Sequence, residues 1–217
     1  MRESDSATLM TEGSIWKKIT FFAVPIFLGN LFQQMYNTAD SLIVGNFLGS
    51  NALAAVSSSG NLIYLMIGFF NGIALGAGVV IARYFGARDQ ENVEKAVHTT
   101  VAFGIVASIV LTIVGVFFAP QILVWMQTPA NVMPESTEYF RVYFMGSAGF
   151  VMYNMFVGIL QAVGDSKHPL YYLILSSIIN VVLDIVFITV FDMGVGGAAF
   201  AHDISKVVRA VIRIPTL

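Results

Sequence analysis

The chain has 217 residues, of which 57% are hydrophobic and 11% charged, with a net charge of −2 and a mean hydropathy of +0.78. This balance is typical of a polytopic membrane protein, and it offers no basic surface to a nucleic acid. The absence of cysteine excludes disulfides, thiolate metal sites and cysteine nucleophiles.

Six apolar segments are long enough to cross a bilayer, which takes roughly 20 residues. In chain order they are residues 19–45, 54–82, 97–119, 139–162, 170–191 and 195–213. The stretches between them contain turn residues such as Gly, Pro, Asn and Asp. We therefore predict an all-α membrane protein, a bundle of six transmembrane helices that follows a cytoplasmic segment at residues 1–18.

The distribution of positive charge predicts the orientation. If the N-terminus is inside, every Lys and Arg except Arg141 falls on the inner side, as expected when positive loops stay in the cytoplasm. We thus expect a multi-pass protein of the cell membrane with both termini cytoplasmic. Aromatic residues near the helix ends are expected at the lipid–water interface; they are Trp16, Trp125, Tyr139, Tyr143, Tyr171 and Tyr172.

Two carboxylates, Asp40 and Asp184, interrupt apolar segments. An ionisable residue within the hydrocarbon costs ~2.5–3.5 kcal/mol and usually faces the bundle interior. At 1.5 Å per residue, both lie about 25–30 Å from the inner ends of their helices, so one pocket can hold both. Asn180 is four residues before Asp184 and shares its helix face.

Further polar residues accompany these carboxylates. Gln33, Tyr36 and Asn37 share a helix face with Asp40, and the fourth segment contains Tyr153 and Asn154. The group is consistent with a site for a coupling ion. Desolvation favours a protonated carboxyl group, whereas the same oxygen atoms suit Na⁺. The alternative is hydrogen bonding between helices, worth about 0.6 kcal/mol per pair.

Proline and glycine mark two other segments. Pro25 lies inside the first segment, where proline kinks a helix; the kink is either a static packing feature or a hinge. Gly68, Gly72, Gly76 and Gly78 have the spacing of small residues that allow close helix contact.

Three stretches together resemble the multidrug and toxic compound extrusion (MATE) transporters, and within them the DinF-like branch. They are VPIFLGNLFQQMYNTADSLIVGNFLGSNALAAVS, GFFNGIALGAGVVIARYFGARD and LQAVGDSKHPLYYLILSSIINVVLDIVF. The resemblance covers residues 13–200. It implies an antiporter coupled to H⁺ or Na⁺, with no other cofactor, that exports organic compounds, often cationic or amphiphilic. Such transporters have two six-helix lobes around a cavity.

The resemblance also implies roles for particular residues. Asp40, Asn180 and Asp184 match ion-coupling positions of the family, which include a possible Na⁺ site. Gln33, Tyr36 and Asn154 match positions that line the cavity, and we add Asn37 and Tyr153 to them. Pro25 matches the proline at which the first helix of the family bends.

The sequence departs from the family in two ways. It supplies one lobe, the bundle at 19–200, so a second lobe or a homodimer is implied. The tail at 201–217 is atypical and suggests truncation: His202 stands where the family has Thr, and Asp203, Lys206, Arg209 and Arg213 add charge. We interpret His202 as sequence drift rather than a proton relay.

Two alternatives stay open. A single lobe lacks half of the cavity, so the chain can be a membrane fragment without transport activity. Two aspartates on different spans also suggest an intramembrane aspartyl protease. The Gly-x-Gly-Asp signature of that class is incomplete here, because Ala162 precedes Val163, Gly164 and Asp165.

Overall fold

A computed structural model describes residues 14–211, apart from the side chains of Ser58, Asn61 and residues 209–211. The elements in chain order are α1 (Ile15–Leu48), α2 (Ser50–Gly86), α3 (Gln90–Phe117), α4 (Ala119–Trp125), α5 (Met133–Met145), α6 (Ser147–Ala162), α7 (Lys167–Ile185), the π-helical η1 (Val186–Val190) and α8 (Gly194–Val211). The all-α prediction is confirmed. The predictions for residues 1–13, for Arg213 and for the side chain of Arg209 lie outside the described part of the chain.

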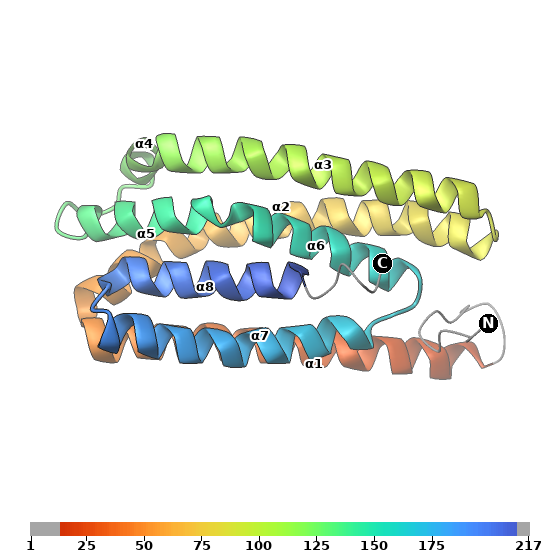
Figure 1. The fold of residues 1–217 in the computed structure, drawn as a ribbon, viewed down its shortest axis with the longest axis horizontal. Helices are drawn as coiled ribbons and strands as arrows, with labels where there is room; N and C mark the ends of the chain where they lie inside the picture. The colour runs from red at the N-terminus through yellow and green to blue at the C-terminus, as the bar shows by residue number, and fades with distance from the viewer. Residues whose placement is uncertain (1–13, 212–217) are drawn as a thin grey trace.

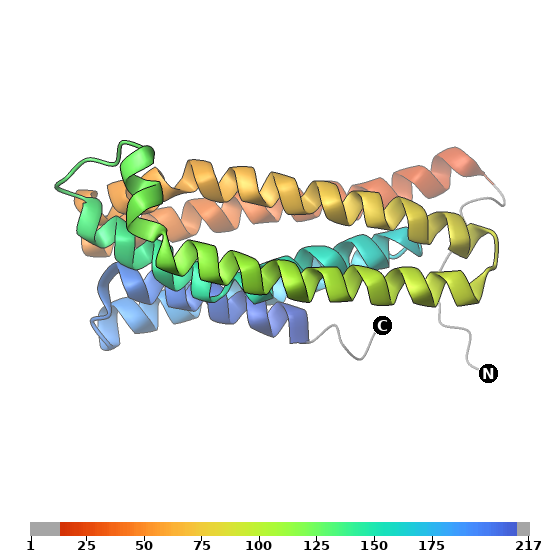
Figure 2. The same ribbon diagram turned by 90° about the horizontal axis from the view of Figure 1, so that it is seen from above.

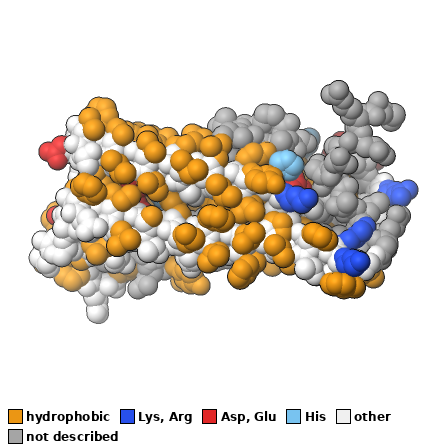
Figure 3. Space-filling model, turned by 90° about the horizontal axis from the view of Figure 1, so that it is seen from below, with side chains coloured by type: hydrophobic (Ala, Val, Ile, Leu, Met, Phe, Trp, Pro, Cys, Tyr) orange, Lys and Arg blue, Asp and Glu red, His pale blue; other side chains and the backbone are white. Residues whose placement is uncertain are grey.

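The long helices run side by side along one axis, and the short α4 crosses one end of the bundle (Figures 1 and 2). The start of α1 and the α2–α3 and α6–α7 connections lie at the opposite end, where Lys17, Arg88 and Lys167 are found (Figure 1). On the face shown in Figure 3, apolar side chains cover most of the surface and Lys and Arg lie toward one end. The side of the membrane that each end faces stays a prediction.

Five of the six predicted spans have an apolar counterpart. The helices α1, α2 and α3, and α7 continued through η1, are each long and apolar enough to cross a bilayer, and α5 with α6 forms a fifth, bent span. Within the described residues, α8 corresponds to the sixth span in position but is less apolar, because it carries His202, Asp203 and Lys206.

The predicted single helix at 139–162 is divided at Gly146. The helices α5 and α6 meet there at 50°. A Cβ atom at Gly146 would overlap the carboxyl group of Asp203 on α8, so only glycine allows α8 to pack this closely. The sequence signal for this break is the pair Gly146–Ser147, because Gly/Ser pairs are a usual site of sharp helix kinks.

The helices α2 and α6 make a close contact through small residues. The carbonyl oxygen of Gly158 lies 3.1 Å from the position of a Cβ atom built on Gly78. The predicted glycine stripe is wrong for Gly68, Gly72 and Gly76, because a Cβ atom at each of them would meet no atom within 4 Å in the chain. Of these four glycines, only Gly78, at the C-terminal end of the stripe, therefore packs against a neighbour in this lobe.

The start of α3 supplies one pH-dependent prediction. Asp89 caps the helix by accepting hydrogen bonds from the backbone N–H of Asn92 (3.2 Å) and from its side-chain amide (2.7 Å). These bonds lower the pKa of Asp89 below its ordinary value of 3.8. The stabilisation is thus present above pH 3.8 and is lost as the pH falls through the lowered pKa.

We expect Asp89→Ala to expose the first turn of α3 to faster amide exchange at neutral pH, because the cap is lost. The difference from the unmodified protein should shrink as the pH is lowered through the acidic range. Hydrogen exchange of the first turn measures this. A difference that does not change with pH would contradict the role of the Asp89 carboxylate.

Candidate functional site

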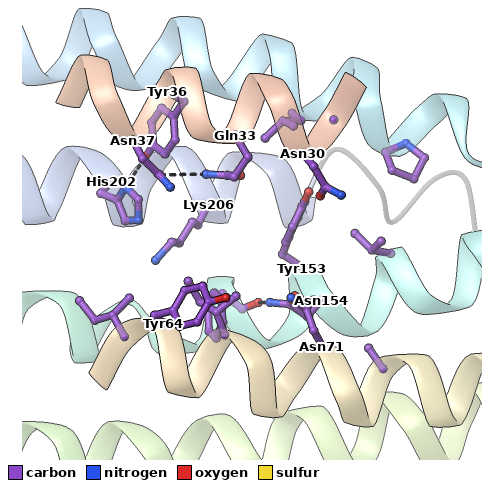
Figure 4. A pocket seen from close by; sticks show the side chains of 18 of the residues that line it. Asn30, Gln33, Tyr36, Asn37, Tyr64, Asn71, Tyr153, Asn154, His202 and Lys206 are labelled. Carbon is purple, nitrogen blue, oxygen red and sulfur yellow. Dashed lines mark hydrogen bonds between the residues drawn. The ribbon is translucent and has the colours of Figure 1, made fainter. Parts of the chain in front are cut away.

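A cavity of about 610 Å³ lies inside the bundle. Its walls come from α1, α2, α5, α6, α7 and α8, whereas α3 and α4 pack outside it. Figure 4 shows polar side chains from four of these helices around the space; they are Asn30, Gln33, Tyr36, Asn37, Tyr64, Asn71, Tyr153, Asn154, His202 and Lys206. The cavity is therefore lined by polar groups that lipid would disfavour.

The structure brings Asp40, Asn180 and Asp184 together. Asp40 lines the cavity, while Asn180 and Asp184 are fully buried behind it. The Asp40 and Asp184 carboxyl groups lie close enough to interact with each other. With the Asn180 amide turned so that its nitrogen faces Asp184, it donates to Oδ2 of Asp184 at 2.8 Å, and its oxygen accepts from the backbone N–H of His202 at 3.2 Å. A hydrogen bond between two carboxyl groups requires that one of them carry a proton.

His202 connects the first helix to α8. Its Nδ1 atom is hydrogen-bonded to the hydroxyl group of Tyr36. The imidazole stacks on the rings of Tyr36 and Tyr143, with ring centres 5.4 and 5.6 Å away. A residue that arose by sequence drift is not expected to make such contacts. The structure places His202 in the cavity wall beside the carboxylate pair.

The other predicted cavity residues also line the cavity. The Gln33 amide donates to Oδ1 of Asn37 at 3.2 Å along α1. Asn154 is buried and donates to the carbonyl oxygen of Phe150 at 2.8 Å, while Tyr153 extends into the cavity (Figure 4). Pro25 also lines the cavity, and α1 continues as a helix through it. The roles of these residues stay predictions.

Sequence reasoning missed Asn30, Tyr64 and Asn71, and it gave three further residues of the wall another role. Tyr139 and Tyr143 were assigned to the lipid interface, but they are 5% and 4% exposed and line the cavity. Their spacing of four residues along α5 was the available signal, because it places both on one helix face. Lys206 was treated as part of an atypical tail, and it also lies in the wall. Trp16 and Trp125 are exposed, as an interfacial position requires.

The carboxylate group was also predicted as a possible Na⁺ site. Among the described residues, no group of three or more His, Asp and Glu side chains is placed to hold a metal ion. The Asn180 amide nitrogen faces Asp184 when the amide hydrogen-bonds to that carboxyl group, and its oxygen faces Asp184 when the amide is turned over. Asp40 and Asp184 offer the hard oxygen ligands that Na⁺ needs, and Asn180 adds a third oxygen in the second orientation.

The sequence profile of the MatE family matches residues 25–186, which is most of the chain. The chain belongs to the MatE family. It is 34% identical over 203 residues to the probable multidrug resistance protein YoeA of Bacillus subtilis (strain 168), covering 92% of this chain and 44% of that protein. This MATE chain thus spans about half the length of the curated relatives that it matches.

Solved MATE structures have the same arrangement of helices. A crystal structure of MATE in the bent conformation has a TM-score of 0.84 at 30% identity, over 92% of this chain and 44% of that one. One in the straight conformation has a TM-score of 0.86 at 31% identity, over 96% and 46%. The fold is that of one MATE lobe. The family consists of transporters rather than enzymes, which removes the support for a protease.

Proposed function

We propose that the chain is an ion-coupled lobe of an antiporter that exports drug-like organic compounds from the cell. The observation that carries the proposal is the Asp40–Asp184 pair, which is buried in the lobe and borders a cavity of about 610 Å³. This volume lies within the range of sites that hold drug-sized ligands, roughly 300–1,000 Å³. The likeness to a protein named for multidrug resistance supports this substrate class.

The coupling ion that the geometry favours is H⁺. The Asp40 and Asp184 carboxyl groups are close enough to share one proton, and an Asn180 amide that donates to Asp184 would suit a carboxyl pair that gains and loses that proton. Loss of that proton would leave two adjacent carboxylates that repel each other. The repulsion would change the packing of α1 on α7 and so link the ion to the shape of the cavity. Na⁺ is the second candidate, since it would neutralise the same pair.

The substrate would occupy the space between α1, α2 and α6. Gln33, Tyr36, Asn37, Tyr153 and Asn154 would contact it through amide and phenol groups. The carboxyl group of Asp40 would attract a cationic part of the substrate. Apolar and aromatic residues in the same wall suit organic, amphiphilic compounds rather than one rigid ligand.

Alternating access requires more than this lobe. We propose that a second lobe, either a C-terminal half or another copy of this chain, completes the transporter in the cell membrane, with both termini of this lobe cytoplasmic. Transporters of this type place substrate sites at the interface between repeats. Pro25 lies inside α1 and lines the cavity, and we propose it as the hinge of this helix, because proline removes a backbone hydrogen bond there.

Reconstituted transport tests this function. The purified chain in liposomes should take up a cationic dye when a proton gradient is imposed, and a Na⁺ gradient of the same size should have a smaller effect. Uptake driven by the Na⁺ gradient alone would show that Na⁺, and not H⁺, is the coupling ion. A correctly inserted chain that moves no dye under either gradient would favour the transport-inactive fragment; co-reconstitution with the missing half would then test the second-lobe proposal.

A further inference from the structure

Lys206 places a positive charge in the wall of the cavity. It is only 7% exposed, and Figure 4 shows its side chain extending from α8 into the space between α1 and the pair formed by α2 and α6. It lies twelve residues along α8 from Gly194, about 18 Å at the rise of an α-helix. A lysine at this depth is costly, and such residues usually mark a functional site.

Aromatic rings fix the position of the amine. The Nζ atom lies 3.8 Å from the ring centre of Tyr143 and 5.1 Å from that of Phe150. Both distances are within the range of cation–π attraction. Since Tyr143 and Phe150 line the cavity themselves, these contacts hold the ammonium group at the cavity surface instead of letting it extend toward the end of the helix.

The charges that act on Lys206 come from two helices. Asp203 lies one turn earlier on α8, with its carboxyl group packed against Gly146, and Asp40 lies across the cavity on α1. Both carboxylates attract the ammonium group electrostatically. Asp40 and Lys206 both line the cavity, so its wall presents a negative group and a positive group to whatever occupies the space.

We propose that Lys206 is a subsite for an acidic group, so that the cavity selects amphiphilic compounds that carry both a cationic nitrogen and a carboxylate. A simple cation would be attracted by Asp40 and repelled by Lys206. A simple anion would be attracted by Lys206 and repelled by Asp40. Only a compound with both charges interacts favourably with both groups, and a cavity of about 610 Å³ has room for both ends of one drug-sized molecule. The inference rests on the proposed function, because it assigns the substrate class of the same cavity.

Two dyes that differ in one group test this subsite. Rhodamine 110 carries a free carboxylate, and rhodamine 123 is its methyl ester with the same cationic ring system. Fluorescence anisotropy measures the binding of each to the full chain in nanodiscs. The unmodified protein should bind rhodamine 110 roughly tenfold more tightly, the effect of one charge-assisted hydrogen bond. Lys206→Met should abolish the preference, because rhodamine 110 loses its attraction to the ammonium group and rhodamine 123 is no longer repelled by it, and Lys206→Arg should keep the preference.

The Asp40→Asn variant is the matched control, because it should weaken both dyes to a similar extent and preserve their ratio. Equal binding of the two dyes by the unmodified protein, or an equal loss for both in Lys206→Met, would overturn the acidic subsite. Binding of rhodamine 123 alone would overturn the subsite and leave the proposed function standing. Binding of neither dye would overturn both. The comparison of the two dyes on the unmodified protein tests the acidic subsite even if Lys206→Met does not fold.

Discussion

Asp40→Asn should abolish the coupling between the ion gradient and export in a complete transporter. Asparagine keeps the size and polarity of the side chain but can neither release a proton nor carry a negative charge. Asp184 would then lose the carboxyl partner with which it interacts. Coupling between two binding sites typically changes affinity by about 5–150-fold, and in this variant we expect the affinity for a cationic dye to become independent of pH.

Dye binding and gradient-driven uptake, each measured over a range of pH, check this expectation. Asp192→Asn is the control, since Asp192 is an exposed aspartate in the α7–α8 connection, outside the cavity. The control should retain gradient-driven uptake. If Asp40→Asn transported dye with an unchanged pH dependence, the assignment of Asp40 to ion coupling would be lost, whereas the lobe fold would be unaffected.

The sequence was informative where local spacing carried the signal. A carboxylate inside an apolar helix must avoid lipid, so Asp40 and Asp184 were expected to face inward at similar depth, and the structure places them in contact. The spacing of Asn180 and Asp184 put the amide on the same helix face, and it donates to that carboxyl group. Such inferences need only helix geometry and the cost of burying charge in hydrocarbon.

The sequence was uninformative where the cause is a contact between distant residues. The close packing at Gly146 involves the Asp203 carboxyl group, which comes from α8. Tyr139 and Tyr143 lie near a helix end, so their position alone fitted a lipid interface equally well. Lys206 was treated as a sign of a degenerate tail, because its favourable contacts with Tyr143 and Phe150 exist only in the folded bundle.

Gly158→Ala should destabilise the bundle although alanine favours helix formation. A Cβ atom at this position would lie 2.6 Å from the backbone oxygen of Ala74 and 3.0 Å from its carbonyl carbon. Backbone atoms of a packed helix cannot move aside as a flexible side chain can, so α2 and α6 must separate. Overpacking of this kind costs about 1–3 kcal/mol, more than the ~0.8–1.0 kcal/mol that alanine gains over glycine in a helix.

Thermal unfolding of the purified chain in detergent measures the effect, and Gly72→Ala on α2 is its matched control. A Cβ atom at Gly72 would meet no atom within 4 Å, so this variant should gain helix propensity and unfold at the same or a higher temperature. A lower unfolding temperature for Gly158→Ala and an equal or higher one for Gly72→Ala would show that the close α2–α6 contact lies at Gly158. Since both helices line the cavity, their separation should also weaken dye binding in Gly158→Ala alone; equal stability of the two variants would contradict the close contact.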